Sequence, residues 1–119
     1  MNPTENFVAE VKMEAADGGV HEATRIMLQP LKNSPPRSLE LSRWYKGLSD
    51  REREFVRDAM TEAVGLALFG LFGVIDGVVV LRGFEKGRFE LAFVKDGERT
   101  ILTGNCFLHD VFRNLMYPS

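Results

Sequence analysis

The sequence predicts an α+β domain in which one long, buried helix packs on a three-stranded antiparallel meander. Three observations lead to this prediction. The stretch from Ser49 to Ile75 begins with a capping signal and continues with apolar residues at helical spacing. Short β-branched or alternating runs follow it, as far as Thr103. An apolar stripe from Phe107 to Met116 then predicts a closing C-terminal helix.

The central helix is predicted from its first turn and from its spacing. Ser49 and Glu52 stand three residues apart, as in a capping box, where each side chain bonds to the other's backbone N–H. No charge occurs from Ala63 to Ile75, so we expect this half to be covered on several sides. The run is shorter than the roughly 18 residues of a membrane span, and Asp76 ends it. A buried core helix is therefore favoured over a membrane helix.

The 119 residues are enough for one domain, whose parts we expect to differ in role. Residues 1–28 predict two peripheral helices with a break at Asp17-Gly18-Gly19. Residues 29–38 hold three prolines and predict an extended connector. Residues 39–119 then form the core, which begins with a short helix.

Three strands are predicted after the central helix. Val78 to Leu81 is β-branched, and Arg88 to Lys95 alternates apolar and polar side chains. Asp96-Gly97 predicts a two-residue hairpin turn, because both residues tolerate positive φ. Glu98 to Thr103 is the returning strand. We expect the apolar face of this meander to pack on the central helix.

Composition narrows the classes of function. An apolar share of 45%, a charged share of 27% and a net charge of −2 are globular values without a whole-chain signal for nucleic acid. The single cysteine excludes an intrachain disulfide. The first residues lack the basic segment and apolar run of a signal peptide, so we expect a cytoplasmic protein.

Cys106, His109 and Asp110 are the one constellation of reactive side chains. Cys and His three apart on a helix can share a face, but a zinc site needs three or four ligands and no second paired motif exists. A Cys/His nucleophile would lack any supporting motif such as a glycine-rich elbow. We prefer a solvated face for His109 and Asp110. The sequence thus predicts no catalytic residue, no metal and no cofactor.

Asp76 is a second candidate, because it directly follows the apolar run at a predicted corner between helix and strand. A carboxylate at such a corner can line a pocket, although it more often caps local backbone N–H groups. A small-molecule-binding protein or enzyme with a pocket near Asp76, Cys106 and His109 is therefore an alternative function.

Trp44 and Tyr45 form the largest aromatic pair in the chain, and these residue types are enriched in binding hot spots. They lie in residues 23–46, which hold five bases, Arg43 among them, and one acid. This chemistry fits an acidic protein partner or RNA. The plainer alternative is that both rings pack toward the long helix and that the bases are solvated or pair with acids of residues 1–22.

Several short motifs stand between residues 35 and 112: Leu41-Ser42-Arg43-Trp44-Tyr45, Leu48-Ser49, Asp50-Arg51-Glu52, Leu68-Phe69-Gly70-Leu71-Phe72, Ile75-Asp76-Gly77-Val78 and Leu108-His109-Asp110. Together they resemble a group of small bacterial proteins of unknown function. The resemblance implies a bacterial cytosolic origin and a single α+β domain. It carries no catalytic residue over to this chain.

Because no catalytic set is visible, the sequence favours a non-catalytic protein-binding domain. An immunity or regulatory role is its concrete form, with a toxin as one class of partner, by analogy of size and composition. RNA binding through residues 23–46 is a second, less favoured alternative, and no membrane contact is expected. We also expect a homodimer, because the apolar load of Ala63 to Ile75 is high for one sheet and two helices to cover. The candidate binding residues are Trp44, Tyr45, Arg43, Asp76, His109 and Asp110.

Overall fold

The computed structural model describes residues 1–118, and it is mostly helical. Three segments run on without a break as one N-terminal rod: α1 (Pro3–Val11), the π-helix η1 (Lys12–Asp17) and α2 (Gly18–Leu28). The other helices are α3 (Pro36–Lys46), α4 (Asp50–Ile75) and α5 (Leu108–Met116). Strands β1 (Ala92–Lys95) and β2 (Glu98–Ile101) pair antiparallel in a sheet of two strands.

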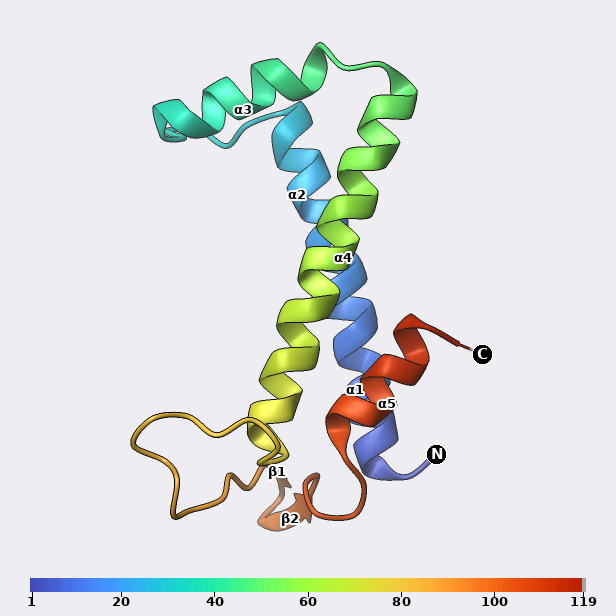
Figure 1. Cartoon of the computed structure of the whole chain (residues 1–119), viewed down its shortest axis with the longest axis vertical. Helices are drawn as coiled ribbons and strands as arrows, with labels where there is room; N and C mark the ends of the chain where they lie inside the picture. The colour runs from blue at the N-terminus through green and yellow to red at the C-terminus, as the bar shows by residue number, and fades with distance from the viewer. Residues whose placement is uncertain (119) are drawn as a thin grey trace.

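The predicted α+β class is therefore wrong, because no three-stranded meander forms in the part of the chain that the structure describes. Val78 to Leu81 is exposed and lies in an irregular segment, residues 76–91, that loops out beyond the end of α4 (Figure 1). Gly77 and Gly83 have φ values of 81° and 92°, so the backbone turns on both sides of the run. A β-branched run favours a strand where a neighbouring strand supplies packing and backbone partners, and no strand pairs with Val78 to Leu81.

The hairpin turn is confirmed. Asp96 and Gly97 have φ values of 52° and 81°, and Lys95 pairs with Glu98 across the turn. This is the geometry that a two-residue turn between antiparallel strands requires. The hairpin itself remains exposed, since Phe93 and Val94 are both more than half accessible.

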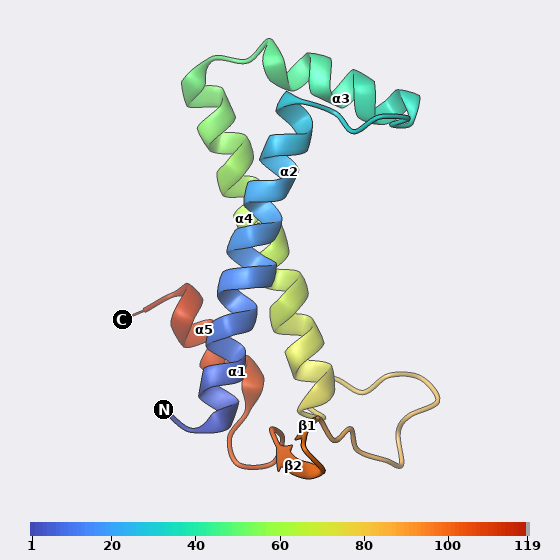
Figure 2. The same ribbon diagram turned by 180° about the vertical axis from the view of Figure 1, so that it is seen from behind.

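The N-terminal rod lies beside α4 and runs antiparallel to it (Figures 1 and 2). The predicted break at Asp17-Gly18-Gly19 does not occur, because the wider turn of η1 carries the helix through it. Contrary to the peripheral role that we expected, α1 supplies Val8 to the core, where it meets Phe72 of α4 and Phe112 of α5. The rod is therefore a structural partner of α4 and α5.

The start of α4 is as predicted. Glu52 donates its backbone N–H to Ser49 Oγ at 3.2 Å, and its carboxylate accepts the Ser49 N–H at 2.8 Å. The hydrogen bond from that backbone N–H holds the pKa of Glu52 below its usual value. The helix ends at Ile75, where the apolar run stops.

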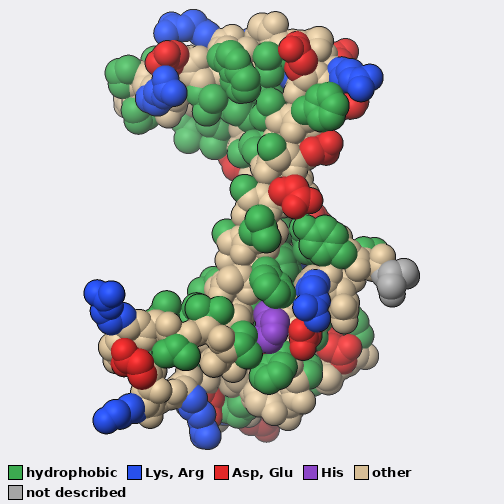
Figure 3. All heavy atoms as spheres, in the orientation of Figure 1, with side chains coloured by type: hydrophobic (Ala, Val, Ile, Leu, Met, Phe, Trp, Pro, Cys, Tyr) green, Lys and Arg blue, Asp and Glu red, His purple; other side chains and the backbone are tan. Residues whose placement is uncertain are grey.

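The predicted burial of α4 is wrong. Only Gly65, Phe72 and Gly73 are buried along its 26 residues, while Leu66 and Leu71 are 65% and 52% exposed. The rod and α5 cover part of the helix, and no sheet within residues 1–118 covers the remainder. Figure 3 shows the result, two lobes joined by a narrow waist. The radius of gyration is 17.8 Å, against about 13.5 Å for a compact domain of this length.

One buried hydrogen bond ties α1 to the chain after β2, and it generates the first prediction. Thr4 is fully buried, and its hydroxyl donates to the Leu102 carbonyl oxygen at 2.8 Å. Replacing Thr4 with Val should lower the free energy of unfolding by about 1–3 kcal/mol, because the buried carbonyl loses its partner. Urea unfolding at fixed protein concentration measures this.

Thr61→Val is the matched control, because Thr61 is exposed on α4 and its hydroxyl bonds only within its own helix. It should change stability by no more than about 0.5 kcal/mol. Equal losses in the two variants would contradict a stabilising role for the Thr4 contact.

Candidate functional site

Asp76 joins the end of α4 to the beginning of α5. Its side chain is 2% exposed. One carboxylate oxygen accepts the Leu108 N–H at 3.0 Å, and the other accepts the His109 N–H at 2.9 Å. The same second oxygen lies 2.5 Å from His109 Nδ1. Asp76 is therefore a cap for a helix that starts more than thirty residues later, and not a local cap.

His109 is held on every side by groups that position it. Phe69 meets its ring edge-on with the ring centres 5.5 Å apart, and Phe107 lies at 5.3 Å. Its Nε2 is 3.5 Å from Asp110 Oδ1, while Asp110 also pairs with Arg113 at 2.8 Å. A carboxylate bonded to Nδ1 is the arrangement that orients a histidine base, so this pair has the geometry of two members of a catalytic triad.

A nucleophile does not complete that arrangement. Cys106 is a partly buried free thiol, and no hydrogen bond joins it to His109 within residues 1–118. In the same residues no three side chains of His, Cys, Asp or Glu gather as a metal-ligand group. Cys106, His109 and Asp110 are therefore close in the sequence, but they do not form one reaction centre.

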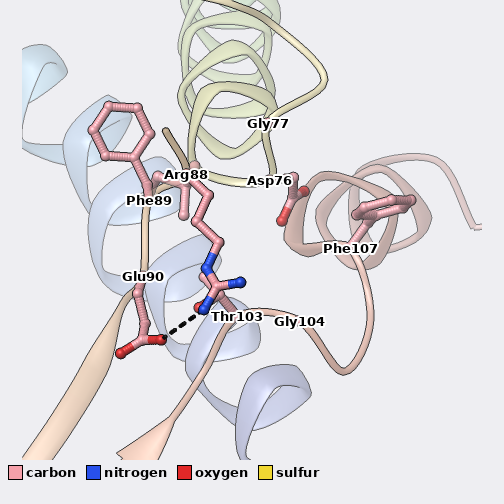
Figure 4. Close-up of a pocket in the computed structure, with 9 residues that line it drawn as sticks. Asp76, Gly77, Arg88, Phe89, Glu90, Thr103, Gly104 and Phe107 are labelled. Atoms are coloured by element: carbon pink, nitrogen blue, oxygen red, sulfur yellow. Dashed lines mark ion pairs between the residues drawn. The ribbon is translucent and has the colours of Figure 1, made fainter. Parts of the chain in front are cut away.

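A cavity of about 300 Å³ opens beside this pair (Figure 4). Its walls include Asp76, Arg88 and Thr103, whereas Cys106 and His109 do not line it. Arg88 reaches into it from the 76–91 segment and lies 4.0 Å from Glu90, its carboxylate partner. Asp76 already accepts two backbone N–H groups and the imidazole, so little of its charge is free for a ligand. We interpret the cavity as a polar depression around a structural clamp.

Trp44 and Tyr45 point in different directions, which the sequence reasoning missed. Tyr45 is 2% exposed, and Arg53 of α4 lies over its ring at 5.4 Å. Arg53 also donates to the carbonyl oxygens of Tyr45 and Lys46, at the last turn of α3. Trp44 is 52% exposed. Successive helical residues are about 100° apart, so both rings could not face α4.

The exposed part of α3 forms what we call the α3 surface: Leu41 and Trp44 with Arg37 and Glu40, and Leu39, Arg43 and Lys46 farther round the helix. Hydrophobic side chains gather on this upper lobe in Figure 3. A shallow depression of about 390 Å³ lies between Arg37, Glu40, Leu41 and Trp44. Buried Ser42 on the other side donates to the Met27 carbonyl oxygen at 2.6 Å, which fixes α3 on α2.

Ion pairs neutralise part of the positive charge of residues 23–46. Arg25 is paired with Glu22, and Arg37 with Glu40 at 3.2 Å. Within residues 1–118, Arg43 and Lys46 of α3 have no ion-pair partner. Two unpaired bases on a helix with an exposed Trp match an acidic-rimmed protein surface better than the continuous cationic groove that tracks a nucleic-acid backbone.

A second apolar surface follows α4, and we call it the α4 stripe: Phe55, Ala59, Ala63 and Leu66, which are exposed, and Gly70, which is half-buried. Phe55 is 59% and Leu66 65% exposed, and a Cβ built on Gly70 would meet no atom within 4 Å. By length and composition alone α4 is able to cross a membrane, and only 17% of its most apolar 18-residue window is buried. The sequence identified these residues as apolar but assigned them to the core.

The total surface of the chain is larger than that of a compact domain. The chain exposes 8736 Å², whereas a compact monomer of 13.4 kDa exposes about 6,500 Å². The excess is about 2,200 Å². Among residues 1–118, eight hydrophobic residues form the buried core, while twenty-one large ones are exposed.

Comparison of the chain with protein-family models, with curated proteins and with solved structures finds no match. Function therefore has to be inferred from the geometry of these surfaces.

The Asp76 clamp generates the second prediction. Asp76→Ala should cost about 2–3 kcal/mol in the free energy of unfolding, because it removes the cap of α5 and leaves buried donors unpaired. Thermal and urea unfolding, with helix content followed by circular dichroism, measure the loss. Asp58→Ala, at an exposed position of α4, is the matched control and should change stability by less than about 0.5 kcal/mol. An unchanged free energy of unfolding in Asp76→Ala would show that the fold does not need the Asp76 contacts.

Proposed function

We propose that this chain is a non-catalytic protein-binding domain and that the α3 surface contacts its protein partner. The observation that carries the proposal is the exposed apolar side chains of α3, where Trp44 is 52% and Leu41 46% exposed. Large exposed apolar patches are features of interaction sites, because isolated soluble domains rarely leave them open.

The α3 surface is prepared for such a contact. Trp44 projects from a helix that Tyr45, Ser42 and Arg53 fasten to the rest of the upper lobe. Because the backbone that carries Trp44 is fixed, binding does not have to order that backbone, which lowers the entropic cost of contact through this residue. The unpaired bases Arg43 and Lys46 on the same helix favour a partner whose rim is acidic.

An immunity or regulatory role in a bacterial cytoplasm is the concrete form of this proposal, with a toxin as the class of partner. A small protein that neutralises another needs a preformed contact surface and no catalytic group. The α3 surface provides such a face. Within residues 1–118 the Asp76–His109 pair lacks a nucleophile, and residues 23–46 lack the continuous cationic groove that RNA binding needs.

A small-molecule site at the Asp76–His109 pair is the second candidate, because an oriented histidine with a 13% exposed side chain lies near a cavity of about 300 Å³. His109→Gln tests it better than Asp76→Ala, since Asp76 also caps α5. Loss of cellular function in His109→Gln with fold and partner binding intact would favour this candidate. RNA retention that is salt-sensitive and lost on changing Arg37, Arg43 and Lys46 would favour the nucleic-acid alternative.

The third prediction concerns the α3 surface. The purified chain, incubated with an extract of its source cells, should retain one protein in stoichiometric amount, which mass spectrometry identifies. With that partner purified, Trp44→Ala should weaken binding about 30-fold or more, the effect of losing a hot-spot aromatic ring. Raising the salt concentration should weaken it further, because the flanking contacts are ionic.

Phe84→Ala is the matched control, since Phe84 is 58% exposed in the other lobe. It should leave the affinity unchanged. Equal affinity of Trp44→Ala and the wild-type chain would rule out the α3 surface. A co-purified metabolite without any protein partner would contradict the binding-domain proposal itself.

A further inference from the structure

We infer that a second copy of this chain covers the α4 stripe, with the two α4 helices antiparallel about a twofold axis between residues 62 and 63. This inference rests on the proposed protein-binding function and extends it, since it names one occupant of the exposed surface. It concerns a different face from the α3 surface, so each can be tested without the other.

The exposed area is large enough to supply such a pairing. Obligate homodimers bury about 2,000–5,000 Å² in total, which is about 1,000–2,500 Å² for each chain. The whole chain exposes about 2,200 Å² more than a compact monomer, and the α4 stripe is one of the surfaces that share this excess. One symmetric contact would cover the stripe on both chains at once.

The α4 stripe is complementary to itself when it is read in opposite directions. Around an axis between residues 62 and 63, Phe55 lies opposite Gly70 of the second copy, and Leu66 lies opposite Ala59. Each large side chain therefore meets a small residue, as interlocked helices require. The open space at Gly70, where a methyl group in place of the Cα hydrogen would meet no atom within 4 Å, is then filled by a phenyl ring.

Charge favours the antiparallel arrangement over the parallel one. The charged residues of α4 all lie in its first half, between Asp50 and Glu62. Parallel helices would place these groups beside their own copies, and their dipoles would also repel. Antiparallel helices place them beside the uncharged half. Glu62, nearest to the axis, is directed to Tyr117 of its own chain, whose hydroxyl donates to it at 3.2 Å.

Cysteine cross-linking tests the arrangement on the full chain. Cys106→Ser removes the single native thiol, and one cysteine is then placed at a chosen position of α4. Ala63→Cys should form a disulfide-linked dimer by itself under mild oxidation. Phe55→Cys and Gly70→Cys should each stay monomeric alone and cross-link when mixed, since in antiparallel helices residue 55 lies about 22 Å along the axis from its own copy.

Arg57→Cys is the control, because it lies on another face of α4 and should not cross-link. Cross-linking of Phe55→Cys with itself would indicate parallel helices and overturn the proposed geometry. Absence of any cross-link, with the chain either monomeric or bound to phospholipid vesicles, would overturn the second copy as occupant.

Ala63→Glu provides a readout that does not depend on oxidation. Position 63 is exposed in the single chain, so the variant should fold, yet its charge would be buried at the twofold axis. The dissociation constant of the dimer should rise at least about 10-fold, and an unchanged constant would overturn the inference. If Ala63→Glu weakens self-association while the α3 surface still binds its partner, the two proposals are separate. If no partner is found but the cross-links form, only the proposed function fails.

Discussion

The rest of the structure depends on how much of the apolar surface of α4 the other elements can bury. This helix is 26 residues long, or about 39 Å, and it is apolar on nearly all sides in its second half. The N-terminal rod and α5 occupy part of its circumference, and residues 1–118 hold no further element that packs on the rest. The two lobes, the narrow waist and the exposed apolar stripe all follow from this shortage of cover.

Two polar contacts decide how the remaining elements meet α4. At one end the Asp76 carboxylate holds the first turn of α5, so α5 packs where it can also reach α1. At the other end Arg53 binds the last turn of α3 and stacks on Tyr45. In the first contact, the Asp76–His109 pair has a structural role. In the second, Tyr45 is buried against Arg53 while Trp44 stays exposed on α3, and this exposed ring is the basis of the binding proposal.

Features that depend on neighbouring residues could be predicted from the sequence. The capping box at Ser49 and the hairpin turn at Asp96-Gly97 are of this kind, because their hydrogen bonds and φ values are local. The strand at Val78 to Leu81 was predicted wrongly, since a strand needs a partner that no local pattern reveals. The Asp76 cap was missed for the same reason, because its acceptors meet donors 32 and 33 residues away. Apolar composition in α4 was interpreted correctly, but composition does not say whether cover comes from the same chain.

Residues 1–118 leave the long helix partly uncovered, and this shortage is what a second copy would relieve. Sedimentation equilibrium over a wide concentration range tests the point most directly, because it weighs the particle without regard to its shape. We predict a mass of twice 13.4 kDa, with dissociation only on strong dilution. A mass of 13.4 kDa at every concentration, from a chain that is fully folded by circular dichroism, would contradict it.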